Sequence, residues 1–223
     1  MELAPLQREN MTARIYRELK GKLMTGQLHP GETITLRSLA ESLGVSQTPV
    51  REALLQLVSE RALALSPGKS VKVPVLTSAQ LQELRDIRLE LESFAARVAA
   101  RNATQELAKD LARIHKGLAV ARKQGDRDAV LKANFEFHFA LYSAARMPHL
   151  LTLIENLWVQ SASYLTFMYQ PPFPSLAGEH PHSRIIAALQ RHDVEGVVRE
   201  VRRDLEGHGQ ILMKILRERG IIE

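Results

Sequence analysis

Residues 36–57 (LRSLAESLGVSQTPVREALLQL) constrain the fold more than any other part of the chain. Apolar residues recur there at helical spacing on both sides of Gly44, the residue type that most readily ends a helix in a left-handed conformation. Their positions are Leu36, Leu39, Ala40 and Leu43 before the glycine, and Val50, Ala53, Leu54 and Leu57 after it. Ser46 is a favourable N-cap for the second helix, and Pro49 fits the first turn of that helix. The pattern predicts a helix-turn-helix, two short helices joined by a tight corner.

The second of these helices carries polar side chains at its N-terminal end. Gln47, Thr48 and Arg51 lie on the face opposite the apolar stripe and can donate hydrogen bonds. In helix-turn-helix proteins this end of the second helix meets base edges in the major groove of DNA. We therefore expect a DNA-binding surface that consists of Arg37, Ser46, Gln47, Thr48 and Arg51. The alternative is a generic helical hairpin with an ordinary solvated face.

The flanking segments count against that alternative. Residues 10–25 predict a third helix, because Ile15, Leu19 and Leu23 share one face and can close a three-helix core. A strand, a turn and a second strand are predicted downstream at Ala62–Leu65, Ser66-Pro67-Gly68-Lys69 and Val71–Pro74. Such a hairpin is the wing of a winged helix-turn-helix, and we expect Gly68 and Lys69 at its tip to lie near phosphate.

Length and composition are consistent with a globular DNA-binding protein. The 223 residues allow two modest domains, and 45% of them are hydrophobic, with few aromatics. The chain has no cysteine and no apolar run near the ~20 residues of a membrane span. Its N-terminus lacks an apolar signal core, so we expect a soluble, cytoplasmic protein. The net charge is +5, and residues 1–74 contribute +3 of it, from ten Lys and Arg against seven Asp and Glu.

The rest of the chain reads as helical. We expect six helices, at about 78–102, 104–123, 126–145, 147–170, 176–190 and 193–218, with no strand. Short connections imply antiparallel neighbours in a bundle. The predicted fold is therefore mainly α, with a winged helix-turn-helix before a bundle of about six helices. The expected parts are a loose arm at 1–9, the DNA-binding domain at 10–74 and a helical domain at 75–223. Gln170-Pro171-Pro172-Phe173-Pro174 reads as a stiff link or a lid.

Polar side chains interrupt the apolar stripes of four predicted helices. They are Arg88, Asn134 with His138, His182, and Asp204 with His208. An unpaired polar group in a core costs roughly 1–3 kcal/mol, so four helices that each carry one suggest that these groups meet. Histidine and carboxylate that converge in a bundle interior form metal sites. We expect Asn134, His138, His182 and Asp204 to hold one Zn²⁺, Ni²⁺ or Mn²⁺ ion per chain. His208 is a substitute ligand or lies behind the ligands.

Each of these residues also has an ordinary interpretation. A histidine on an apolar face is often a core residue with satisfied hydrogen bonds. Arg88 either binds a small organic acid, because guanidinium matches carboxylate bidentately, or forms an internal salt bridge with Glu92 or Glu136. The remaining histidines, for example His149 and His192, look like surface residues. The aromatic residues of the bundle are expected in the core rather than on a pocket wall: Phe135, Tyr142, Trp158, Tyr164 and Phe167.

The chain resembles the GntR family of bacterial transcription regulators over nearly its whole length. In the N-terminal part the resemblance rests on Gly26–Gly31, Leu39-Ala40, Leu43–Ser46 and above all Thr48–Leu54. Further on, Arg88–Ala100, Asn134–His138, and His182 with Ile185, Ala188 and Leu189 resemble the helical effector domain of the FadR-type branch. A six-helix domain resembles the variant of this branch that commonly carries a metal.

Three positions depart from the family pattern. The family usually has Arg where this chain has Gln47, which suits adenine rather than guanine. It usually has a third His at the position of Asp204, and often Asp at Asn134. These differences leave the base preference and the metal preference open.

The resemblance implies a ligand-responsive repressor. It would bind a palindromic operator as a homodimer, since two recognition helices must reach half-sites about one helical turn apart. A small carboxylate held by Arg88 and the metal would change the affinity for DNA. Two alternatives stay open: a metal-free regulator whose histidines hydrogen-bond the effector, and a metalloenzyme tethered to DNA. We expect no catalytic residues and no membrane partner.

Overall fold

The computed structural model describes residues 11–68, 70–170, 173 and 179–223. Three sequence predictions fall outside these residues: the arm at 1–9, Lys69 at the wing tip, and the prolines of the Gln170–Pro174 segment. No helix of the described residues is long and apolar enough to cross a membrane.

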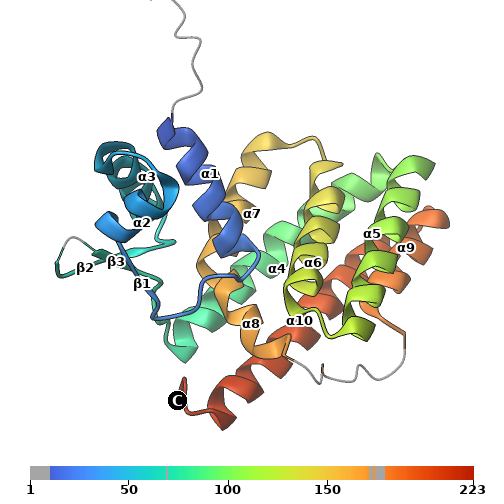
Figure 1. Cartoon of the computed structure of the whole chain (residues 1–223). Coiled ribbons are helices and arrows are strands. Elements are labelled where there is room, and N and C mark those ends of the chain that lie inside the picture. The colour runs from blue at the N-terminus through green and yellow to red at the C-terminus, as the bar shows by residue number, and fades with distance from the viewer. Residues whose placement is uncertain (1–10, 69, 171–172, 174–178) are drawn as a thin grey trace, which may run out of the picture.

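The N-terminal part is a winged helix-turn-helix (Figure 1). Its elements are α1 (Met11–Met24), β1 (Thr33–Thr35), α2 (Leu36–Leu43), α3 (Gln47–Ser59), β2 (Ala64–Ser66) and β3 (Ser70–Lys72). The three strands form an antiparallel sheet in the order β1-β3-β2, in which Ile34 and Leu65 both pair with Val71. The two wing strands are therefore confirmed, with slightly shifted bounds. Strand β1 was missed, because three residues are too few to show an alternating pattern.

The corner between α2 and α3 follows the sequence pattern. Gly44 is left-handed with a φ of 65°, and its N–H caps α2 at the carbonyls of Ala40 and Glu41. The stripe of α3 is buried at all four predicted positions, and in α2 Leu36 and Ala40 are buried. Leu43 is an exception, with 40% of its surface exposed, because it lies at the end of α2 beyond the packed core.

Ser46 occupies the N-cap position of α3 with extended backbone angles, as predicted. Its side chain makes no capping hydrogen bond, however. The serine hydroxyl is therefore not held by the fold and is available to another acceptor or donor.

The remainder is an all-helical bundle in the part of the chain that the structure describes. Its elements are α4 (Ser78–Arg101), α5 (Gln105–Gln124), α6 (Arg127–Ser143), α7 (Pro148–Ser161), the 3-10 turn η1 (Ala162–Tyr164), α8 (Leu165–Met168), α9 (Pro181–Gln190) and α10 (Val194–Glu218). The predicted breaks at Gly125 and Pro148 are confirmed: Gly125 is the left-handed C-cap of α5, and Pro148 is the first residue of α7.

One predicted helix is wrong. Residues 147–170 form two helices with a 3-10 turn between them rather than one helix. The hydroxyl of Ser161 bonds back to the carbonyls of Leu157 and Trp158 at 3.3 and 3.4 Å, a pattern that competes with the helix ladder and bends helices. The chain turns at this point, which brings Ser161 toward the interior of the bundle.

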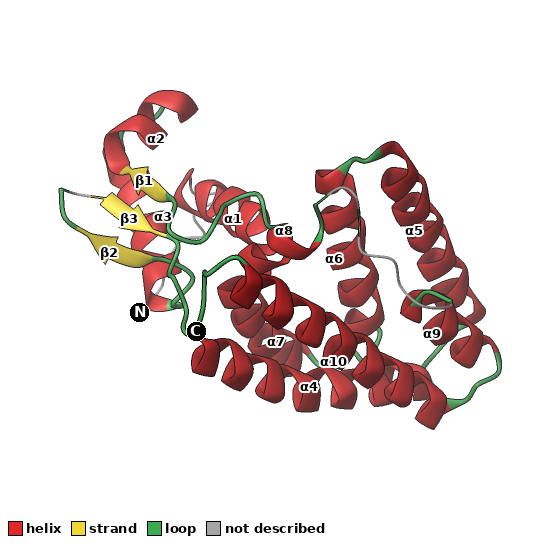
Figure 2. Cartoon of the chain, turned by 90° about the horizontal axis from the view of Figure 1, so that it is seen from below, coloured by secondary structure: helices red, strands yellow, loops and turns green. Residues whose placement is uncertain are grey.

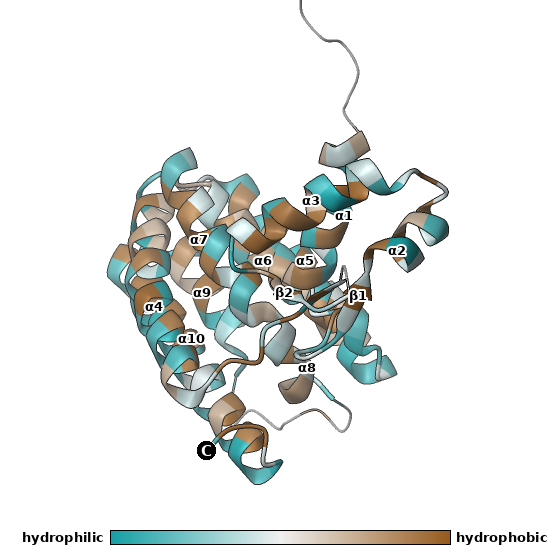
Figure 3. Ribbon diagram, turned by 90° about the vertical axis from the view of Figure 1, so that its left-hand side faces the viewer, coloured by the Kyte–Doolittle hydropathy of each residue, from teal (hydrophilic) through white to brown (hydrophobic). Residues whose placement is uncertain are grey.

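Long helices dominate the bundle. Helices α4 and α10 run side by side, and α5, α6 and α9 gather at the far side from the winged helix-turn-helix (Figure 2). Hydrophobic positions repeat along the helices between hydrophilic ones, as amphipathic packing requires (Figure 3). The largest fully buried side chain is that of Trp158, on α7.

The two parts of the molecule are in direct contact through α1. The indole Nε1 of Trp158 donates a hydrogen bond of 3.2 Å to the carbonyl of Met24, the last residue of α1. Gly26 follows with a φ of +67°, and a Cβ atom there would lie 3.0 Å from Cγ2 of Thr166. Lys20 on α1 adds an ion pair of 3.5 Å to Glu155 on α7. The end of α1 is therefore fitted closely against the bundle.

Candidate functional site

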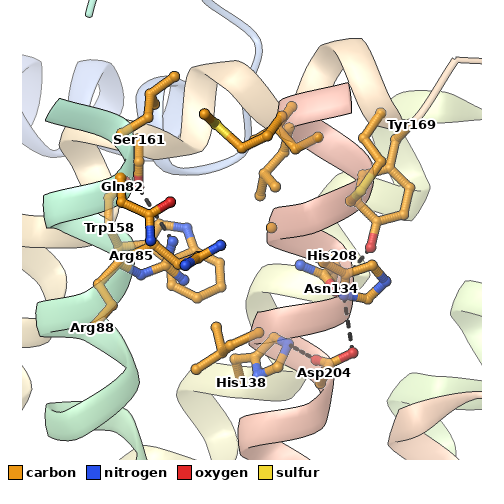
Figure 4. Close-up of a pocket in the computed structure, with 17 residues that line it drawn as sticks. Gln82, Arg85, Arg88, Asn134, His138, Trp158, Ser161, Tyr169, Asp204 and His208 are labelled. Atoms are coloured by element: carbon orange, nitrogen blue, oxygen red, sulfur yellow. Dashed lines mark hydrogen bonds and ion pairs between the residues drawn. The ribbon is translucent and has the colours of Figure 1, made fainter. Parts of the chain in front are cut away.

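A pocket opens in the bundle between α4, α6, α7, α8 and α10. Figure 4 shows two chemically different walls. Arg85 and Arg88 extend from α4 on one side, beside Trp158 and Ser161 of α7. The other side carries the polar side chains predicted as metal ligands or their neighbours: Asn134, His138, Asp204 and His208.

The structure brings three of the four predicted ligands within reach of one ion. The possible ligand atoms of His138, His182 and Asp204 all lie within 4.8 Å of one another, and all three residues are buried. His138 Nε2 lies 3.1 Å from Asp204 Oδ2, and His182 Nε2 lies 3.9 Å from the same oxygen. Asn134 is buried on the same pocket wall, and its Oδ1 accepts a hydrogen bond of 3.4 Å from Tyr169.

Hydrogen bonds behind His138 fix which ring nitrogen carries a proton. The Tyr142 hydroxyl donates its one proton to Glu92 Oε2 at 2.6 Å, so its oxygen can only accept from His138 Nδ1, 3.2 Å away. In the neutral ring, Nε2 then has the lone pair and faces the Asp204 oxygen. Two lone pairs 3.1 Å apart repel each other unless a proton or a cation lies between them. This is the arrangement by which a neighbouring group prepares a histidine as a metal ligand.

The ring nitrogens of His182, which have no hydrogen-bond partner in the part of the chain that the structure describes, are also consistent with a metal site. Neither ring nitrogen has a hydrogen-bond partner among the described residues, although the side chain is fully buried. Its ring stacks on Phe137 at 3.7 Å between centroids. Burial lowers the pKa of His182 well below its usual value, so the ring is neutral and has a lone pair to give. Buried polar atoms without partners call for an explanation, and a bound ion or water supplies one.

Asp204 remains ionised although it is almost completely buried. Burial alone would raise its pKa, but His208 and His138 outweigh burial and lower the pKa of Asp204 well below its usual value. His208 Nδ1 lies 2.9 Å from Asp204 Oδ1. Burial opposes the charge of His208, yet the Asp204 carboxylate raises the His208 pKa above its usual value. The donor set of two histidine nitrogens and a carboxylate therefore fits a divalent cation, with His208 beside the carboxylate and Asn134 on the same pocket wall.

Arg88 makes the internal salt bridge that was the alternative to effector binding, and it also lines the pocket. Its Nε lies 2.6 Å from Glu92 Oε1, and its Nη1 donates a hydrogen bond of 3.2 Å to Ser161. The guanidinium lies 4.3 Å from the ring centroid of Trp158. Glu136, the other predicted partner, instead pairs with Lys132 at the surface. Glu92 links Arg88 to Tyr142, so one hydrogen-bonded chain runs from the arginine wall to His138.

Several pocket residues were not predicted. Trp158 was expected in the core, and it is buried, but it also forms pocket wall. Arg85 lines the pocket because Gly209 leaves room for it: a Cβ atom at 209 would lie 2.6 Å from Arg85 Cδ. Gly209 was the only sequence signal for the position of Arg85. It could not be used from the sequence alone, because the packing of α4 against α10 was not known. Phe135 and Tyr164 pack in the bundle as expected.

The predicted DNA-binding residues lie together at the N-terminal end of α3. Gln47, Thr48 and Arg51 are exposed, as is Ser46. Arg37 on α2 is also exposed and forms an i,i+4 ion pair of 2.8 Å with Glu41. Gly68 has a φ of +77° at the wing turn. The surface thus offers donors that no buried interaction occupies.

Comparison with known proteins decides the family. The pattern of the bacterial regulatory proteins of the gntR family matches residues 11–73, and the FCD domain matches residues 83–207. The chain belongs to the GntR family. The resemblance drawn from the motifs is therefore confirmed, and so is the mainly α fold with a winged helix-turn-helix at its start.

Relatives of this GntR-family chain are transcription regulators. It is 37% identical to the HTH-type transcriptional regulator McbR of Escherichia coli (strain K12) over 189 residues, 84% of this chain and 86% of that protein. The solved structure of E. coli McbR/YncC superposes with a TM-score of 0.87 at 34% identity, covering 93% of this chain and 99% of that one. The gluconate operon transcriptional repressor of Bacillus licheniformis is 29% identical over 152 residues, 68% of this chain and 62% of that protein. The chain is a transcription regulator and not an enzyme.

Proposed function

We propose that this regulator is a homodimeric repressor whose affinity for a palindromic operator is set by a small organic acid bound with a metal ion. In this proposal residues 10–74 bind DNA, and residues 75–223 bind the ligand and form the dimer. The observation that carries it is the pocket with an arginine wall opposite a wall of metal-ligand side chains (Figure 4). A carboxylate is the ligand that both walls favour.

The metal is assigned to Asn134, His138, His182 and Asp204. The 3.1 Å approach of His138 Nε2 to Asp204 Oδ2 and the unpartnered nitrogens of His182 support this assignment. When bound, the ion supplies a concentrated positive charge that attracts a carboxylate oxygen. Because the set mixes imidazole with carboxylate and amide oxygen, it accepts Mn²⁺ as well as Zn²⁺ or Ni²⁺.

Arg88 is assigned to the other end of the acid. Its interactions with Glu92 and Ser161 use two of its five N–H donors, and they fix the plane of the guanidinium against Trp158. A fixed guanidinium loses less conformational entropy when it binds a carboxylate. Arg85 also lines the pocket, where its guanidinium is paired with Asp86 at 3.1 Å.

Trp158 is proposed to connect the pocket to the DNA-binding part. One face of its ring lies against Arg88, and its Nε1 bonds to the Met24 carbonyl at the end of α1. An acid that pulls on Arg88 would move the indole, and the indole would move α1 with the recognition helix. Such coupling is reciprocal, so operator DNA would change the affinity for the acid by the same factor.

Repression and the use of two copies rest on general arguments. Two relatives, from Bacillus licheniformis and Bacillus subtilis, are described as gluconate operon transcriptional repressors. Recognition helices of a symmetric dimer read two half-sites of a palindrome, and the donors of α3 and the wing would touch bases and phosphates.

Mn²⁺ titration tests the pocket assignment. Calorimetry on chelator-treated protein should give one Mn²⁺ per chain, lost in His138→Ala and kept in the matched variant His149→Ala, whose histidine is exposed on α7. Malonate, malate and citrate are then screened for a rise in Tm of the Mn²⁺-loaded protein, beside Arg88→Lys, which keeps the charge and loses the planar fork.

The Tm measurements distinguish a metal-dependent carboxylate site from a metal-free one. A rise in Tm that needs both Mn²⁺ and Arg88 supports the proposal. A rise in metal-free protein would support a regulator whose histidines hold the acid directly. An unchanged Tm with all three acids, in either form of the protein, would contradict this pocket as a carboxylate site.

A further inference from the structure

A second histidine cluster lies next to the pocket and shares one residue with it. His115 of α5, His180 at the N-cap of α9 and His182 of α9 offer ligand atoms that all lie within 4.8 Å of one another. Their ring centroids are 5.0 Å apart for His115 and His180, 5.6 Å for His115 and His182, and 4.6 Å for His180 and His182. His115 and His180 were expected to be ordinary surface histidines, but both are partly buried.

Every ring in this cluster has a buried nitrogen without a partner in the described part of the chain. These atoms are Nδ1 of His115, Nε2 of His180 and both nitrogens of His182. The opposite nitrogen of His115 lies 3.0 Å from the Ser183 hydroxyl, which leaves Nδ1 free to hold the lone pair. Three neighbouring rings that each leave a buried nitrogen unsatisfied call for a common explanation.

We propose that His115, His180 and His182 form a second transition-metal site, made of nitrogen ligands alone and suited to Zn²⁺. Three histidines with an open fourth position are a recurrent zinc arrangement. Ligand nitrogens of a tetrahedral zinc lie about 3.4 Å apart, given a Zn–N distance of about 2.1 Å. Because the ligand atoms here lie within 4.8 Å of one another, any two of them approach by at most about 1.4 Å on binding. This proposal is argued from these three rings alone and stands even if the carboxylate-containing set binds no metal.

The charges around the cluster admit a cation. Burial holds the rings neutral, and it lowers the pKa of His180 to about 3. Asp204 and Glu179 act on the rings with negative charge, and Arg122 opposes them at His180. Binding through His180 Nε2 needs the proton on Nδ1, which gives up the 3.2 Å cap bond from the backbone N–H of His182. One weak hydrogen bond is thus exchanged for a metal–nitrogen bond.

His182 connects the two sites. A neutral imidazole has one lone pair, so His182 completes either the set with His138 and Asp204 or the set with His115 and His180. The two sites therefore compete, and they differ in preference: imidazole suits Zn²⁺, whereas a carboxylate is needed to hold Mn²⁺ well. We expect Mn²⁺ to occupy the first set and Zn²⁺ to occupy mainly the second.

Co²⁺, a coloured substitute for Zn²⁺, tests the second site in the full chain. The double variant His138→Ala/Asp204→Ala removes two ligands of the first set and none of the second, and it should still bind one Co²⁺ per chain with visible absorption. Adding His115→Gln and His180→Gln should weaken Co²⁺ at least 100-fold. Adding His149→Gln and His192→Gln, which replace two surface histidines, should change nothing. The proposal is overturned if the first double variant binds no Co²⁺, or if the two added pairs behave alike.

A second measurement covers the case in which the double variant does not fold, which circular dichroism would report. His115→Gln/His180→Gln in the otherwise unchanged chain should keep its affinity for Mn²⁺ and lose at least tenfold in preference for Zn²⁺ over Mn²⁺. An unchanged preference would overturn the proposal.

Discussion

The DNA-binding surface and the pocket are built in opposite ways. Gln47, Thr48 and Arg51 are close in sequence and exposed, and in the described structure none has a side-chain hydrogen bond to another residue. The pocket groups come from separate helices and are buried, and most bond to another member of the set. Substitutions in the DNA-binding surface should therefore have additive effects, whereas substitutions in the pocket should be strongly coupled to one another.

The largest effect is expected at α3. Arg51→Ala and Gln47→Ala should each cost roughly 1–3 kcal/mol of operator binding, and the double variant should cost close to their sum. Fluorescence anisotropy at one salt concentration, on a duplex selected from randomised palindromes, measures this. Arg113→Ala is the matched control, because Arg113 is an exposed arginine on α5. Full affinity in Arg51→Ala would contradict the assigned surface.

A double-mutant cycle should find the opposite behaviour in the pocket. Tyr142→Phe removes the group that holds His138 Nδ1, and it should weaken Mn²⁺ by about 10- to 100-fold. Glu92→Gln disturbs the same chain of hydrogen bonds. The double variant should be no worse than the poorer single variant, because both act through His138. Additive losses, measured by calorimetry, would show that the two residues act separately.

Trp158→Phe tests the contact between the pocket and the DNA-binding part. Phenylalanine keeps most of the packing but cannot donate to Met24, so the unfolding free energy should fall by about 0.5–1.5 kcal/mol. Carboxylate binding should persist while its effect on DNA affinity is lost. If the carboxylate changed the DNA affinity of the Trp158→Phe protein as much as that of the wild type, the indole would have no part in the coupling.

Gly26→Ala tests the fit of α1 against the bundle through stability alone. The left-handed backbone costs alanine about 1–2 kcal/mol, and the new methyl group would lie against Thr166. For a chain of this size we expect Tm to fall by about 2–8 °C. Gly117→Ala is the control, because a Cβ atom there meets nothing within 4 Å. Equal changes in Tm for both variants would contradict the close fit of α1 to the bundle.

The same contrast explains what the sequence could predict. The corner at Gly44 and the stripe of α3 follow from local spacing, so the helix-turn-helix was readable. Single polar residues on apolar stripes indicated His138, His182 and Asp204, because burial of such groups needs a reason. The packing partners were not readable: Arg85 against Gly209, and His115 near His180, depend on which helices meet. The break at Ser161 depends on hydroxyl bonding that helical periodicity does not register.

Operator affinity in the presence of a pocket ligand tests the central claim most directly. The measurement is the Kd of Mn²⁺-loaded protein for its selected duplex, with and without the carboxylate that raises Tm most. The account predicts that the carboxylate changes Kd at least fivefold in the wild type, about 1 kcal/mol of coupling, and less than twofold in Trp158→Phe. A carboxylate that binds in the pocket and leaves the wild-type Kd unchanged would contradict it.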